Sequence, residues 1–170
     1  MAISFQERLV GAVKLDARVY AGVKADVNAF GQAMGVVGLA AIAAGIGSLG
    51  GAGMVGGILR FVLAWAAWAG IMFLVGTRIL PEKQTQEDPR AFLRPVGFAA
   101  APGAGQILGI VPILGPFLMF VASCWMIVAT VFGVKAALNY TDTGRAAAVV
   151  GIGLIFFIAF WFIVSAVFGS

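Results

Sequence analysis

Five long apolar stretches dominate this sequence and limit what it can fold into. They cover residues 29–50, 58–80, 91–110, 117–138 and 146–168. A helix needs about 20 residues to cross the hydrocarbon core of a bilayer. Only helices and closed barrels satisfy every backbone polar group in lipid. We therefore predict an all-α integral membrane protein, a bundle of five transmembrane helices.

The composition agrees with lipid as the surrounding solvent. Of the 170 residues, 11% are charged and 62% are hydrophobic, whereas soluble domains carry about 25% charged residues. The net charge of +4 could suggest a nucleic-acid partner in a soluble protein. Here the basic residues flank the apolar stretches, so we interpret them as determinants of topology and expect no nucleic acid to bind.

The distribution of lysine and arginine predicts an orientation. One side of the predicted bundle carries ten of them: Arg8, Lys14, Arg18, Lys24, Arg78, Lys83, Arg90, Arg94, Lys135 and Arg145. Only Arg60 lies on the other side. Cytoplasmic segments carry the excess of basic residues, so the N-terminus should be cytoplasmic and Ser170 external. The alanine and glycine bias hints at a bacterial source and hence at the inner membrane.

Residues 1–28 form a separate amphipathic segment before the transmembrane domain, 29–170. Ser4 and Glu7 have the spacing of a capping box, which closes the first turn of a helix. Asp16 is placed to cap a second short helix, and Asn28 to cap the first span. The apolar residues recur on one helical face. We expect these helices to lie along the cytoplasmic headgroups with their basic side chains toward lipid phosphate; the alternative is a flexible tail that a partner orders.

The first and last spans differ in bulk. Small residues four apart recur along residues 29–50, and helix backbones in lipid approach closely at such positions. The candidate packing residues are Gly31, Gly35, Ala41, Gly45, Gly47 and Gly51. Residues 146–168 instead carry aromatic side chains on all faces, which suits lipid or a large partner protein.

The third span contains the clearest irregularity. Pro102 removes a backbone donor and predicts a kink, and Gly103 and Gly105 follow it closely. The freed carbonyl needs a protein partner or a water-lined cavity. Gln106, one turn later, either satisfies that backbone or lines a small cavity.

Few residues offer catalytic or cofactor chemistry. The chain has no histidine and one cysteine, Cys124, so haem, iron–sulfur and zinc sites have no plausible ligand set. The carboxylates Glu82, Glu87 and Asp88 lie in one hydrophilic linker. We expect no enzyme activity and no cofactor. Lys135 and Arg145 flank the last linker and should reach the headgroups, with a lipid phosphate site between them as an alternative.

Several local stretches resemble the Yip (Ypt-interacting protein) family, particularly its small prokaryotic members. They are residues 5–10 (FQERLV) with 14–16 (KLD), 76–78 (GTR), 94–102 (RPVGFAAAP) and 137–146 (ALNYTDTGRA). The resemblance implies five spans and a role as a membrane adaptor or organiser. Eukaryotic members bind Rab-type GTPases through a long polar N-terminal region. This chain lacks such a region, so the resemblance gives little support for GTPase binding.

We therefore expect a non-enzymatic membrane protein that acts by helix packing, either with other integral membrane proteins or with itself as a homo-oligomer, and that contacts lipids. The alternative is a small permease or channel that uses the broken helix at 102–105, because unwound backbone near the midplane can bind a substrate.

Overall fold

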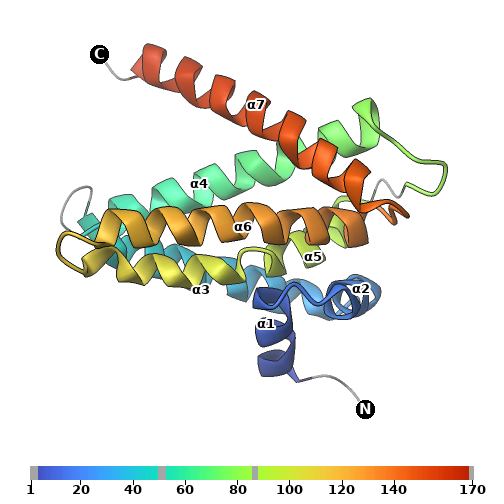
Figure 1. The fold of residues 1–170 in the computed structure, drawn as a ribbon, viewed down its shortest axis with the longest axis horizontal. Coiled ribbons are helices and arrows are strands. Elements are labelled where there is room, and N and C mark those ends of the chain that lie inside the picture. The colour runs from blue at the N-terminus through green and yellow to red at the C-terminus, as the bar shows by residue number, and fades with distance from the viewer. Residues whose placement is uncertain (1–3, 50–52, 86–87, 169–170) are drawn as a thin grey trace.

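The computed structural model describes residues 4–49, 53–85 and 88–168, and within these ranges it contains helices and no strands. The all-α prediction is confirmed. The elements follow in the order α1 (Phe5–Val13), α2 (Ala17–Ala25), α3 (Ala29–Gly47), α4 (Gly53–Leu74), a π-helical turn η1 (Val75–Ile79), α5 (Pro89–Phe98), a 3₁₀ segment η2 (Ala101–Ile110), α6 (Gly115–Ala137) and α7 (Thr143–Phe168) (Figure 1).

Four helices are long and apolar enough to cross a membrane: Ala29–Gly47, Gly53–Ile79, Gly115–Ala137 and Thr143–Val164. These four correspond to the predicted spans at 29–50, 58–80, 117–138 and 146–168, so the chain has the helices of a multi-pass membrane protein. Three of the starts lie before the predicted ones, and two of these three have a local reason. Pro116 is tolerated in the first turn of α6, where its missing N–H is not needed. Asp142 accepts from the backbone N–H of Gly144 and Arg145 and so starts α7 before Ala146.

The segment predicted as the third span, residues 91–110, breaks earlier than we predicted. α5 ends at Phe98, and the chain continues after Ala99 and Ala100 as the 3₁₀ segment η2. The break therefore precedes Pro102, where we predicted a kink. Proline disfavours α-helical geometry in the residue before it. The tighter bonds from Ala100 N to Gly97 O, 3.1 Å, and from Gly103 N to Ala100 O, 2.8 Å, carry the chain through the break.

The α5–η2 segment nevertheless runs parallel to α3 along nearly its whole length. A methyl group on Gly97 would lie 2.9 Å from the Ala33 Cβ, and one on Gly103 would lie 3.0 Å from the Ala40 Cβ. At the far end a methyl group on Gly109 would lie 2.6 Å from the carbonyl oxygen of Gly47. Later residues of α5–η2 contact later residues of α3, so the two segments run in the same direction. The contacts continue to Gly47 at the end of α3, so α5–η2 extends as far along the bundle as α3 does.

The N-terminal helices pack against the bundle (Figure 1). The capping box is present, with Glu7 N donating to Ser4 Oγ at 3.3 Å and Ser4 N to Glu7 Oε2 at 2.8 Å. Asp16 caps α2 through the backbone N–H of Arg18. The apolar face of α2, including Val19, Tyr20 and Val23, is buried among protein groups.

The proposed cap at Asn28 is not made. Asn28 precedes α3 but its side chain forms no capping hydrogen bond, and its own N–H donates to Asp26 Oδ1 at 2.9 Å. Asp26 also pairs with Arg8 at 2.7 Å. The segment is thus joined to the start of α3 by Asp26 and Arg8, and Arg8 reaches Gln32 of that helix at 3.1 Å.

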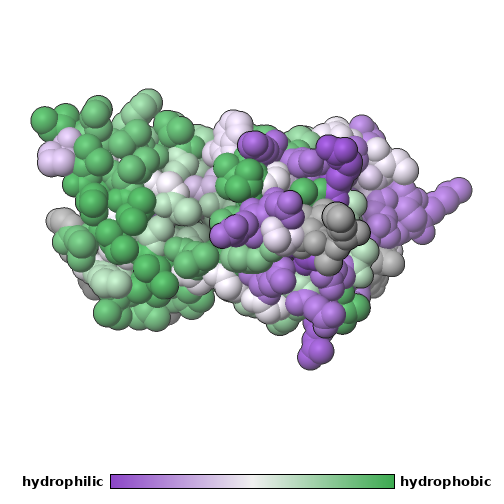
Figure 2. All heavy atoms as spheres, turned by 90° about the horizontal axis from the view of Figure 1, so that it is seen from below, coloured by the Kyte–Doolittle hydropathy of each residue, from purple (hydrophilic) through white to green (hydrophobic). Residues whose placement is uncertain are grey.

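Hydrophobic and hydrophilic side chains separate along the long axis of the bundle. In the face drawn in Figure 2, hydrophobic residues cover the half where α3 turns into α4, and hydrophilic residues gather over the half that holds α1 and α2. The core is built largely from alanine and valine of α3, α5 and α6, with Phe92, Phe98 and Met72 as its large buried side chains. Small residues let these elements approach closely.

Candidate functional site

The predicted packing residues of α3 fall into two groups. Gly45 and Gly47 lie at close contacts: a methyl group would be 2.7 Å from the Met54 carbonyl oxygen at Gly45, and 2.1 Å from the Gln106 carbonyl oxygen at Gly47. Ala41 is buried. Gly31 and Gly35 are exposed, and no heavy atom of the described chain lies within 4 Å of a methyl group placed on either. They therefore pack against no other helix in the described part of the chain. Gly51 lies outside the described residues.

Of the predicted residues around the broken helix, Gly103 and Gly105 lie at close contacts with neighbouring helices. Pro102 and Gly103 are buried. A methyl group on Gly103 would lie 2.8 Å from the Met126 sulfur, and one on Gly105 would lie 3.3 Å from the Ala122 Cβ. These glycines allow η2 to fit between α3 and α6.

Gln106 lines a cavity of about 230 Å³ between α4, η2, α6 and α7. Two tryptophans, Trp65 and Trp68, form part of its wall, and Ser123 and Thr130 add hydroxyl groups. Trp68 donates its indole N–H to Thr130 at 3.3 Å. The Gln106 amide nitrogen reaches the Met126 sulfur at 3.8 Å, a weak acceptor. The cavity can hold a small, mostly apolar group with one or two polar atoms.

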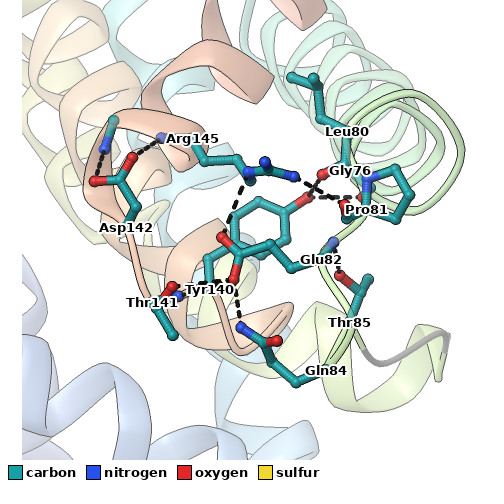
Figure 3. Close-up of polar contacts among 11 residues, drawn as sticks. Gly76, Leu80, Pro81, Glu82, Gln84, Thr85, Tyr140, Thr141, Asp142 and Arg145 are labelled. Atoms are coloured by element: carbon teal, nitrogen blue, oxygen red, sulfur yellow. Dashed lines mark hydrogen bonds and ion pairs between the residues drawn. The ribbon is translucent and has the colours of Figure 1, made fainter.

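Lys135 and Arg145, the predicted headgroup pair, lie in different environments. Arg145 donates to the Pro81 carbonyl oxygen at 2.8 Å and pairs with Glu82 at 3.5 Å (Figure 3). Lys135 donates to Thr143 at 2.7 Å and lines another pocket with Lys24 and Arg94. Arg145 is thus paired with a carboxylate, whereas the hydrogen bond of Lys135 is to a neutral hydroxyl group.

The contacts of Arg145 belong to a polar cluster that joins the two linkers at one end of the bundle (Figure 3). The Tyr140 hydroxyl lies 2.7 Å from the Gly76 carbonyl oxygen and 2.8 Å from that of Leu80. Thr141 donates its hydroxyl to Glu82 at 3.2 Å. Burial raises the pKa of Tyr140 to about 12, so its hydroxyl stays protonated and can donate. The cluster caps the π-helical end of α4 and holds residues 80–82 beside 140–145.

Two residues of the Lys135 pocket, Lys24 and Arg94, were not identified as site residues from the sequence. A signal for Arg94 exists in the sequence: it lies inside a predicted span, where a charge is costly and often functional. Lys24 had no such signal, because its closeness to Arg94 arises only from the docking of α2. Among the described residues no group of His, Cys, Asp or Glu is arranged to hold a metal ion.

Comparison of this chain with protein-family models, with curated proteins and with solved structures finds no match.

Proposed function

We propose that this chain is a non-enzymatic, multi-pass membrane protein that organises or supports other membrane components through helix packing. Its Yip-like sequence stretches support the same role, that of an adaptor or accessory subunit. The ten clustered basic residues support a cytoplasmic N-terminus and an external C-terminus. The parallel course of α5–η2 and α3 supports a fifth crossing by this segment.

The observation that carries the proposal is the open space beside Gly31 and Gly35. Glycine in a helix costs about 1 kcal/mol relative to alanine. Neither glycine is needed for a contact within the described chain, since nothing lies within 4 Å of a methyl group at either position. Glycines four apart on an outward face are the pattern by which a second transmembrane helix packs closely in lipid. A partner helix, from another protein or another copy, accounts for them.

α7 offers a second surface of a different kind. From Leu154 to Val164 it has no buried side chain among those described, and its C-terminal part diverges from α6 (Figure 1). Phe156, Phe160 and Phe162 are exposed on it. Large aromatic side chains add dispersion contacts with a partner helix or with acyl chains.

Replacing both Gly31 and Gly35 with leucine should abolish association while leaving the fold intact. The new side chains point into open space in this chain but would block a closely packed helix. The measurement is native mass spectrometry of the protein extracted in mild detergent, with co-purifying proteins identified. The matched control is Gly70→Leu in α4, which also has nothing within 4 Å and is exposed. A wild-type protein that is strictly monomeric and carries no partner would contradict the proposal.

A second candidate, a permease or channel for a small uncharged solute, is favoured by the position of Gln106 in the cavity. If it transports, proteoliposomes should equilibrate glycerol or urea faster than empty liposomes, as followed by stopped-flow light scattering. Gln106→Leu should remove the excess rate, whereas Ile107→Leu, at an exposed neighbouring position, should not. Rates equal to those of empty liposomes would exclude these solutes as substrates.

A further inference from the structure

A second pocket, of about 610 Å³, lies where α2 docks against α5 and α6. Each of the three helices contributes one cation to its lining: Lys24 from α2, Arg94 from α5 and Lys135 from α6. Among the described residues that line it there is no carboxylate. Alanine side chains and Phe132 form most of the remaining wall, so the pocket is apolar except where the three cations, Asn139 and Tyr140 face it.

Arg94 is the central group of this pocket. The residue is 8% exposed, and its Nη1 donates to the carbonyl oxygen of Lys24 at 2.8 Å. Its Nε is buried and has no hydrogen-bond partner within the described part of the chain. A buried guanidinium with an unused donor is costly unless an anion joins it.

Asp26, an acid whose pKa responds to the charge of Arg94, is already bonded to another arginine. The pKa of Asp26 is lowered chiefly by its hydrogen bond with the Arg8 side chain, then by the N–H of Asn28, and only to a smaller extent by the charge of Arg94. Asp26 lies 2.7 Å from Arg8 and does not line the pocket. Asp26 is therefore bonded to Arg8 and not to Arg94.

The two lysines bond only neutral oxygen atoms among the described residues. Lys24 donates to the side-chain oxygen of Asn139, and Lys135 donates to the Thr143 hydroxyl at 2.7 Å. Burial lowers the pKa of Lys24, which is the direction expected for an ammonium group without a counter-ion. Both ammonium groups retain further donors that can turn toward an anion.

We propose that this pocket binds a phosphate group, and specifically the phosphate of an anionic phospholipid headgroup. The guanidinium and the two ammonium groups come from three helices, and each can donate to the two unesterified oxygen atoms of a phosphodiester, which carry its negative charge. The pocket is larger than the phosphate needs, and its alanine walls fit the glycerol and the first acyl carbons. Basic pockets between membrane helices near the surface are a recurring place for lipid headgroups.

The binding site would also explain why α2 is held against the bundle. Lys24 belongs to α2, and the other two cations belong to α5 and α6. One phosphate that contacts all three would bridge the N-terminal segment to the membrane-spanning helices.

The test is lipid binding by the full-length protein in detergent, measured by native mass spectrometry and by thermal shift. The probes are phosphatidylglycerol, zwitterionic phosphatidylcholine and inorganic phosphate. Wild-type protein should bind phosphatidylglycerol at least about tenfold more tightly than phosphatidylcholine and be stabilised by it. Arg94→Gln should weaken phosphatidylglycerol binding about tenfold or more, since it removes a charge-assisted contact. The control, Arg90→Gln, changes an exposed arginine in the same helix.

Because Arg94 also holds the Lys24 backbone, a second variant keeps the test decisive. Lys24→Gln with Lys135→Gln preserves hydrogen-bonding side chains but removes two charges, and it should lose binding to a similar extent. Equal binding by wild type and this double variant would overturn the proposal. If inorganic phosphate bound as tightly as phosphatidylglycerol and competed with it fully, the site would be one for free phosphate and the lipid assignment would be wrong.

Discussion

Gly47→Ala is expected to destabilise the folded protein by about 3 kcal/mol, the upper end of the usual cost of overpacking. The added methyl group would lie 2.1 Å from the carbonyl oxygen of Gln106 and 3.1 Å from its carbonyl carbon. Both atoms belong to the backbone, so no side-chain rotation can relieve the clash. α3 and η2 would have to separate. The measurement is equilibrium unfolding in detergent, followed by tryptophan fluorescence.

Gly38→Ala is the control for this effect, because it makes the same change in the same helix. Nothing lies within 4 Å of the new methyl group, and alanine is the better helix former, so the stability should stay equal or rise by up to about 1 kcal/mol. Equal losses in the two variants would show that the α3–η2 contact does not have the geometry described.

Tyr20→Ala is expected to detach the N-terminal helices while the long helices stay folded. Tyr20 is fully buried, stacks on Phe132 of α6 with 6.5 Å between ring centroids, and donates its hydroxyl to the Ala12 carbonyl oxygen at 3.0 Å. Truncating a large buried aromatic side chain costs about 3–5 kcal/mol. Limited trypsin digestion should then cut rapidly after Arg18 and Lys24, whereas the wild-type segment should resist.

Two milder variants separate the sources of this effect. Tyr20→Phe keeps the ring and loses only the hydrogen bond, so its cost should be near 1 kcal/mol. Val27→Ala alters an exposed side chain in the same region and should leave digestion unchanged. If Tyr20→Ala resisted trypsin as well as Val27→Ala does, the segment would not depend on this contact for docking.

Local sequence signals identified the short-range features of the fold. The capping box of Ser4 and Glu7 and the cap at Asp16 follow from side chains that bond their own backbone two or three residues away. The four long helices follow from the length of their apolar runs. By contrast, the break before Pro102 was displaced from its predicted position, because proline restricts the residue before it and the close contacts of η2 with α3 and α6 extend the irregularity.

Which face of each helix is buried could not be predicted from the residues of that helix. Gly31 and Gly47 belong to the same pattern of small residues, yet one faces outward and the other meets the backbone of η2. In water, polarity would distinguish the two faces. In lipid both faces of a spanning helix are apolar, so hydrophobicity does not mark which one is buried.

The sequence by itself determined that this chain forms long apolar helices with most of its positive charge in the segments between and before them. Those properties depend on residues close together in the chain and on the solvent that suits them. Only the tertiary structure decided that Lys24, Arg94 and Lys135 share one pocket. It also decided that Arg145 forms an ion pair with Glu82 and a hydrogen bond with the Pro81 carbonyl oxygen. The three pocket residues are far apart in sequence. They come together because α2, α5 and α6 pack against one another, and that packing depends on the shapes and contacts of whole helices.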